Sequence, residues 1–182
     1  MRKLLLLAMV IVLLVVVNDT YATDPPQGWL GIEFGSPREK LIAKGTDEYG
    51  AFVSDKKVGE NEILVFHHGV PISEKFYVEA VCFDYFKNRL FSISAFGMWG
   101  QDYKSLLNAI TAKYGLFKTE DIQNVYGNTI GIKHTWTIQT VQILLTYNRT
   151  KESVSLVYVY IPILADVIKD KKKEAEKDKD SF

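Results

Sequence analysis

The chain has 182 residues, with 22 basic and 22 acidic side chains and a formal net charge of zero. This balance gives no general electrostatic attraction to nucleic acid, so we expect no nucleic-acid partner. Hydrophobic residues make up 47% of the chain and aromatic residues 13%, which is enough apolar material for the core of one domain.

The N-terminus predicts a cleavable secretory signal peptide over residues 1–22. Two basic residues precede an unbroken apolar run over residues 4–17, which is the order found in signal peptides. Thr20 and Ala22 place small residues before a cut after Ala22. An uncleaved anchor is the alternative, but a spanning helix needs about 20 apolar residues and this run is shorter. No cysteine lies directly after the run, within residues 18–26, so we expect no stable membrane anchor after cleavage and a periplasmic or secreted protein.

The next signal along the chain predicts a short helix. Ser36 is expected to cap a helix, Pro37 suits the first helical position, and Glu39 is expected to complete a capping box. We therefore expect a helix over residues 37–44, ended by the left-handed conformation that Gly45 adopts easily.

Strands are expected after this helix. Residues 51–54 and 62–67 are candidates, and residues 78–86 and 89–96 flank the pair Lys87-Asn88. Two apolar runs separated by two such residues predict a tight hairpin, because Asn88 tolerates the positive φ of the turn.

The second half of the chain repeats this order. Residues 101–114 carry apolar residues at helical spacing and end at Gly115. Residues 130–138 and 141–147 alternate with a period of two, and residues 154–161 are apolar on both sides, as in a central strand covered on two faces.

The last segment changes from apolar to charged. Residues 163–168 predict the start of a helix, and from Lys169 almost every side chain is charged. The mixed signs predict a solvated tail that is either helical or disordered.

Together these elements predict an α+β fold: an antiparallel sheet of about six strands with helices packed on one face. Phe34-Gly35 and Phe96-Gly97 precede the two helices, and Tyr49-Gly50 and Tyr114-Gly115 follow them. This correspondence suggests an internal repeat of two helix–three-strand units. We expect a signal peptide over residues 1–22, one domain over 23–168 and a charged tail over 169–182.

A family resemblance rests on these same motifs. The segment 31–39 resembles the "G-I-x-F-G-x-S/P-x-x-E" start of many small exported bacterial proteins of unknown function. The hairpin 85–90, the helix end 113–115 and the strand residue Trp136 are similar to theirs, so the resemblance covers most of residues 29–161.

In outline the order of helix and strands is also similar to the β-lactamase-inhibitor-protein-like fold, which is shared by small periplasmic lipoproteins of outer-membrane assembly. That resemblance implies binding to other proteins rather than chemistry. The chain lacks the lipidated cysteine of those lipoproteins.

The search for catalytic, cofactor-binding and metal-ligating residues gives none to predict. His67 and His68 are adjacent, so on a strand they point to opposite faces and cannot readily hold one ion. His134 lies in the apolar stripe of residues 130–138 and is expected to be a satisfied, half-buried histidine. Cys82 is the only cysteine and lies in an apolar run, where we expect a buried, inert thiol.

Acids and hydroxyls do not predict a catalytic site either. Ser92 and Ser94 alternate on a strand as ordinary face residues. Glu79 and Asp84 differ by an odd number, so a regular strand points them to opposite faces. Glu33 and Glu74 are acids too, and their spacing brings no two acids together.

Two functions remain as hypotheses. The first is a non-enzymatic periplasmic binding or protein-interaction module with an envelope protein as its partner, in which Trp29, Trp99 and the strand tyrosines are the contacts. The alternative is a small periplasmic hydrolase or ligand carrier with a pocket between sheet and helices, for which His67, His68 and Glu79 are the residues to inspect. Neither hypothesis includes a cofactor.

Overall fold

The computed structural model of the chain describes residues 24–29, 31–48, 52–58, 61–73 and 76–179. The predicted signal peptide lies outside these residues, so its cleavage stays a prediction. In the described part of the chain, every helix is too short or too polar to span a bilayer.

Helices alternate with runs of antiparallel strands along the chain. The elements are β1 (Gly28–Trp29), β2 (Ile32–Glu33), α2 (Arg38–Glu48), β3 (Phe52–Val58), β4 (Asn61–Ser73), β5 (Phe76–Phe86), β6 (Arg89–Trp99), the 3-10 turn η1 (Gly100–Asp102), α3 (Tyr103–Tyr114), β7 (Lys118–Gln123), β8 (Thr129–Ile138), β9 (Val141–Asn148), β10 (Ser153–Tyr160) and α4 (Ile161–Lys179).

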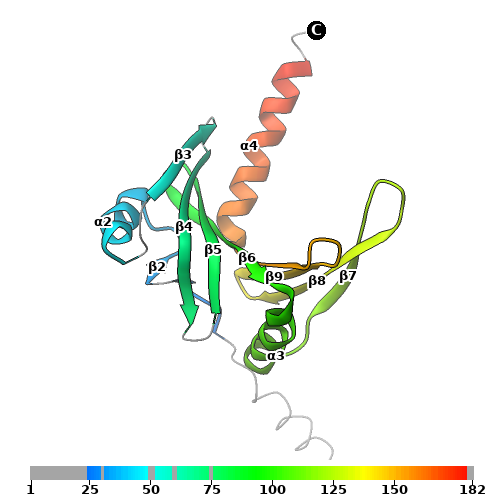
Figure 1. Ribbon diagram of the computed structural model, residues 1–182. Helices are drawn as coiled ribbons and strands as arrows, with labels where there is room; N and C mark the ends of the chain where they lie inside the picture. The colour runs from blue at the N-terminus through cyan, green and yellow to red at the C-terminus, as the bar shows by residue number, and fades with distance from the viewer. Residues whose placement is uncertain (1–23, 30, 49–51, 59–60, 74–75, 180–182) are drawn as a thin grey trace, which may run out of the picture.

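Eight of the strands form one antiparallel sheet in the order β3-β4-β5-β6-β10-β9-β8-β7, and β1 pairs with β2 separately. The α+β class and the antiparallel sheet are therefore confirmed. The sheet has eight strands and not the expected number of about six. Strand β7 (KTEDIQ) was not expected, because it has no hydrophobic alternation that would predict a strand. In Figure 1 the strands β3–β5 and β7–β9 run in clearly different directions, so the sheet is strongly twisted.

The sheet is built from two four-strand meanders. Helix α2 is followed by β3 to β6, and helix α3 is followed by β7 to β10. The last strands of the two meanders, β6 and β10, pair antiparallel at the centre. Each helix is thus followed by four strands and not by the three expected.

One face of the sheet carries the main core. Leu41 of α2 and Leu106 and Ile110 of α3 are buried in the same apolar cluster as the inward-facing residues of β4 to β6 and β8 to β10. Helix α4 instead contributes Ile163 and Val167 to a small second cluster with Phe86 and Phe91.

The central strand β10 differs from expectation. Val154 and Leu156 are buried, whereas Ser155, Val157 and Val159 on the opposite face are half-buried. The second face is thus covered only in part, because α4 packs beside the β5–β6 turn and then extends away from the sheet (Figure 1).

The β5–β6 hairpin forms as predicted. Lys87 and Asn88 both adopt positive φ, 50° and 58°, which is the conformation of a two-residue turn that fits twisted strands. The Asn88 side chain also accepts a hydrogen bond from the Arg38 N–H, 2.9 Å, and donates one to Glu39. The turn therefore caps α2, which runs through Gly45 instead of ending there.

The charged C-terminal segment is helical as far as Lys179. The first turns of α4 are tied to the β5–β6 turn, where Arg89 pairs with Asp166 at 2.8 Å and Lys87 with Asp170 at 3.6 Å. The boundary expected at residue 169 thus falls inside one continuous helix.

Candidate binding surface

His134 lies in an aromatic cluster on the core face. Its Nε2 is 2.5 Å from the Tyr103 hydroxyl and its Nδ1 is 2.9 Å from the Thr119 hydroxyl. Phe117 contacts its ring edge-on, with centroids 4.7 Å apart. The side chain is 4% exposed, and burial lowers the pKa of the imidazole. The expectation of a satisfied histidine is confirmed, although it is buried rather than half-buried.

This arrangement has a chemical consequence. A neutral imidazole needs one donor and one acceptor as neighbours, and the two hydroxyls can supply both. Because each ring nitrogen of His134 has a hydroxyl partner, the ring is held in place as a structural link between α3, β7 and β8.

Cys82 and Asp84 lie on β5 with Ser94 and Ser92 opposite them on β6. Burial raises the pKa of the Asp84 carboxyl, and a hydrogen bond from the Ser92 hydroxyl acts in the opposite direction. Burial, together with the nearby Asp84 charge, raises the pKa of the Cys82 thiol to about 11. A thiol with this pKa is protonated at neutral pH and is a poor nucleophile. Cys82 is half-buried and not buried as expected, and its inertness stays a prediction.

Of the other candidates from the sequence, Glu33 lines a small hollow of about 110 Å³ with Thr140 and Tyr160. Glu33 and Glu79 are exposed, the side chains of His67 and His68 lie outside the described part, and Glu74 is outside it entirely. Within that part, no group of three or more His, Cys, Asp or Glu side chains is arranged to hold a metal ion.

Trp29 is not the exposed contact that we expected. Its ring lies 5.7 Å from that of Tyr158, and both pack against the main core. Tyr147 also packs there, stacked on Tyr103 with centroids 4.9 Å apart. The Trp99 side chain lies outside the described part. The tyrosines of β9 and β10 therefore stabilise the fold instead of presenting a surface.

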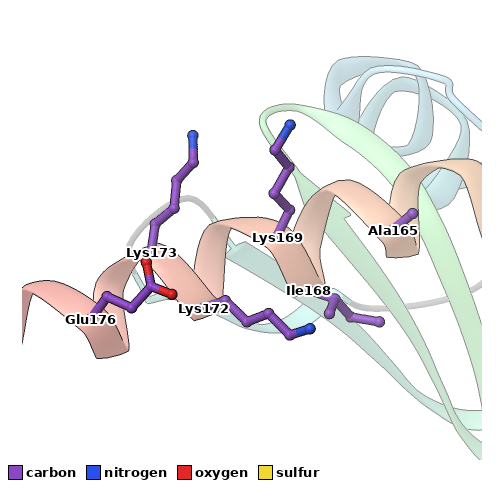
Figure 2. Close-up of a pocket in the computed structure, with 6 residues that line it drawn as sticks. All are labelled: Ala165, Ile168, Lys169, Lys172, Lys173 and Glu176. Carbon is purple, nitrogen blue, oxygen red and sulfur yellow. The ribbon is translucent and has the colours of Figure 1, made fainter.

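A shallow hollow of about 450 Å³ follows α4 and is lined by one helix only: Ala165, Ile168, Lys169, Lys172, Lys173 and Glu176. Figure 2 shows that Lys169 and Lys173 extend to one side of the helix, whereas Lys172 extends to another. The amino groups thus do not converge on one point, and the hollow is a solvated helix surface.

The most exposed large apolar residues of the described part lie along one edge of the sheet, beside β7 and in the β7–β8 loop. Strand β7 is the last in the sheet order and pairs with β8 alone among the described strands. The loop after it, residues 124–128, has a fixed shape. The Asn124 side-chain oxygen accepts the N–H groups of Tyr126 and Asn128, each at 3.0 Å, and Gly127 adopts a φ of 80°.

Three apolar side chains at the ends of β7 are almost fully exposed to solvent. Val125 and Tyr126 at the loop are 93% and 85% exposed, and Leu116 just before the strand is 92% exposed. Other large exposed apolar residues in the described part reach at most 46%. We call Leu116, the outer edge of β7, Val125 and Tyr126 the hairpin surface.

The two faces of β7 differ in charge. On one face Glu120 pairs with Lys118 at 2.7 Å and with Lys133 at 2.5 Å. The hydrogen bonds from Lys118 and then Lys133 lower the pKa of Glu120 to about 2. Asp121 points to the other face, and no ion pair is found for it among the described residues. It is exposed.

Sequence patterns overlooked this surface. The pair Val125-Tyr126 stands in a segment without periodicity, between residues that favour turns. The signal that could have found it is the spacing of Asn124 and Gly127, which predicts a structured tip.

Comparisons with known proteins add nothing to this geometry. No protein-family model, curated protein or solved structure matches the chain. The resemblance to exported bacterial proteins and to the β-lactamase-inhibitor-protein-like fold therefore stays a prediction.

Proposed function

We propose that the chain is an exported, non-enzymatic protein-interaction module that binds an envelope protein through the hairpin surface. The observation that carries this proposal is the nearly complete exposure of Leu116, Val125 and Tyr126 around an open strand edge. Val125 and Tyr126 form an adjacent, almost fully exposed apolar pair at the loop, and Leu116 lies at the opposite end of β7. Large apolar side chains in water are normally scattered singly, and adjacent ones mark interaction sites.

The loop geometry supports a binding role. The bonds of Asn124 hold residues 124–128 in one conformation before any partner arrives. A preorganised contact loses little conformational entropy on binding, so more of the contact energy contributes to affinity. Tyrosine is also among the residues that most often dominate interface energies.

Export is proposed from the signal-peptide features of residues 1–22, which place the mature chain in the periplasm or outside the cell. With one cysteine, Cys82, the chain cannot form an internal disulfide, so packing must stabilise the fold in an oxidising compartment.

We also propose that the two halves descend from one duplicated helix–strand unit. Support comes from the matching order of α2 with β3–β6 and α3 with β7–β10. A second point of support is that Gly35 and Gly97, at equivalent positions, both have positive φ, 82° and 78°.

Site-specific cross-linking tests the binding role. A photoreactive phenylalanine analogue replaces Tyr126 in the mature chain, and in a control it replaces Ile168, which is 46% exposed on α4. Both proteins are mixed with envelope extract of the source cells and irradiated. We expect a defined adduct from position 126 that is absent from position 168, and that excess unlabelled wild type suppresses. Equal adduct patterns at both positions would contradict the proposal.

A further inference from the structure

The backbone of β7 offers hydrogen bonds to a further strand. The Asn124 N–H donates to the Asn128 carbonyl, 2.9 Å, so this residue faces β8. The register shifts between Ile122 and Gln123, but the extra residue, Ile130, lies on β8, so the alternation along β7 is uninterrupted. Counting back from Asn124 therefore turns the N–H and C=O groups of Thr119, Asp121 and Gln123 away from β8. Such an open edge is a template for another extended chain.

The apolar residues define how long that chain must be. Leu116 precedes β7, and Val125 and Tyr126 follow it, so a strand of about ten residues would cover both ends at about 3.3 Å per residue. Its terminal residues would meet these apolar side chains, and its middle would lie along Thr119 to Gln123.

A second copy of this chain fits the edge poorly. Two identical antiparallel strands related by a two-fold axis pair one residue with itself. A register centred on Asp121 places that acid directly against its own copy. A register centred on Glu120, which Lys118 and Lys133 neutralise, leaves each Asp121 opposite a Thr119 and without a basic partner. Like charges directly opposite each other destabilise a strand pair, and such charges are a usual protection of edges against self-association.

The charge of the edge selects the partner's middle residue. The Thr119 side chain is hydrogen-bonded to His134 and therefore lies on the core face of the sheet. Asp121 shares that face, because residues two apart on a strand point the same way. Glu120 on the opposite face is already neutralised by Lys118 and Lys133. Asp121 is therefore the acid on this edge that needs a basic residue opposite it on an incoming strand.

We infer, resting on the proposed function, that the partner contributes an extended segment that adds as a strand to the free edge of β7. The segment carries a lysine or arginine opposite Asp121 and apolar residues near both ends, against Leu116 and against Val125 and Tyr126. Main-chain hydrogen bonds supply general affinity, and the side chains at the centre and the ends supply selectivity.

The test uses the mature full chain and a library of biotinylated ten-residue peptides with apolar ends and a randomised centre. Among the peptides that wild type binds, Lys and Arg are expected to be about fivefold more frequent than Asp and Glu at one central position. This ratio corresponds to the usual energy of a cross-strand charge pair. Asp121→Lys is expected to invert the preference. The control variant Glu176→Lys, on α4, changes the net charge by the same amount. It should leave the peptide preference as in wild type. An Asp121→Lys protein that selects the same peptides, or a wild type that selects none, would overturn the inference.

Amide hydrogen exchange of the complex with the best selected peptide checks the geometry. The N–H groups of Thr119, Asp121 and Gln123 are expected to become protected at least about tenfold, since each gains a hydrogen bond. Unchanged exchange there rules out strand addition, while cross-linking at position 126 would still report binding through the loop. Wild type is expected to sediment as a monomer. A dimer dissociated by Tyr126→Ser would identify a second copy as the occupant instead.

Discussion

Replacing His134 by leucine tests how the sheet is joined to α3. The change removes hydrogen bonds to Tyr103 and Thr119, each contributing about 1 kcal/mol. It also removes the ring contact with Phe117, worth about 0.5–1.5 kcal/mol. Leucine restores some apolar contact, so we expect a net loss of about 2 kcal/mol. In a domain of this size, that lowers the melting temperature by about 4–8 °C.

Thermal and urea unfolding followed by circular dichroism measure this loss. Tyr103→Phe is the companion variant, expected to lose about 1 kcal/mol, and the double variant should lose less than the sum because the pair is coupled. A His134→Leu protein within about 0.5 kcal/mol of wild type would refute the assignment, because that is the range of ordinary surface changes.

The same side chain predicts a pH dependence. Burial lowers the pKa of His134 below 6.5, so the unfolded chain takes up the proton first as the pH falls. The contribution of the neutral ring is fully present above about pH 6.5 and is lost progressively below it. His134→Gln should flatten the stability profile in that window. An identical profile in both proteins would show that His134 is not the titrating group.

Two further predictions concern β5 and its turn. Asn88→Ala should cost about 2 kcal/mol, because it loses both the cap on Arg38 and the tolerance of positive φ, whereas Asn88→Gly keeps the turn and should cost about half as much. Equal costs measured by urea unfolding would refute this division. Cys82 should react with iodoacetamide at pH 8 at least about a hundredfold more slowly in the folded chain than in urea, because its pKa is raised to about 11 and it is half-buried. Equal rates by mass spectrometry would contradict the raised pKa.

Local sequence signals predicted the elements whose cause is local. The β5–β6 hairpin follows from two alternating runs and the turn residue Asn88, and α3 follows from a stripe that includes Leu106 and Ile110. Strand β7 has no such signal, because it is held by contacts that appear only on folding. These are the bond between Thr119 and His134 and the ion pairs of Glu120.

The candidate surface was harder to predict for the same reason. Trp29 is the kind of side chain expected at an interface, yet its neighbour Tyr158 draws it into the core. Tyr126 lies in a short loop whose exposure depends on the bonds of Asn124 and on the position of β7 at the edge. Residue type alone therefore does not tell which of these aromatic side chains is buried and which is exposed.

The central claim is that the chain binds its partner through the hairpin surface. The most direct test measures the affinity of the cross-linked envelope protein for a tip variant and for a matched control variant. Val125→Ser combined with Tyr126→Ser removes the apolar tip, and Ile168→Ser removes an exposed apolar residue on α4. We predict at least about tenfold weaker binding for the tip variant, since hot-spot losses exceed about 1 kcal/mol per residue. Ile168→Ser should bind as wild type, and all three should melt within about 2 °C of one another. Equal affinity of wild type and the tip variant would contradict binding through the hairpin surface.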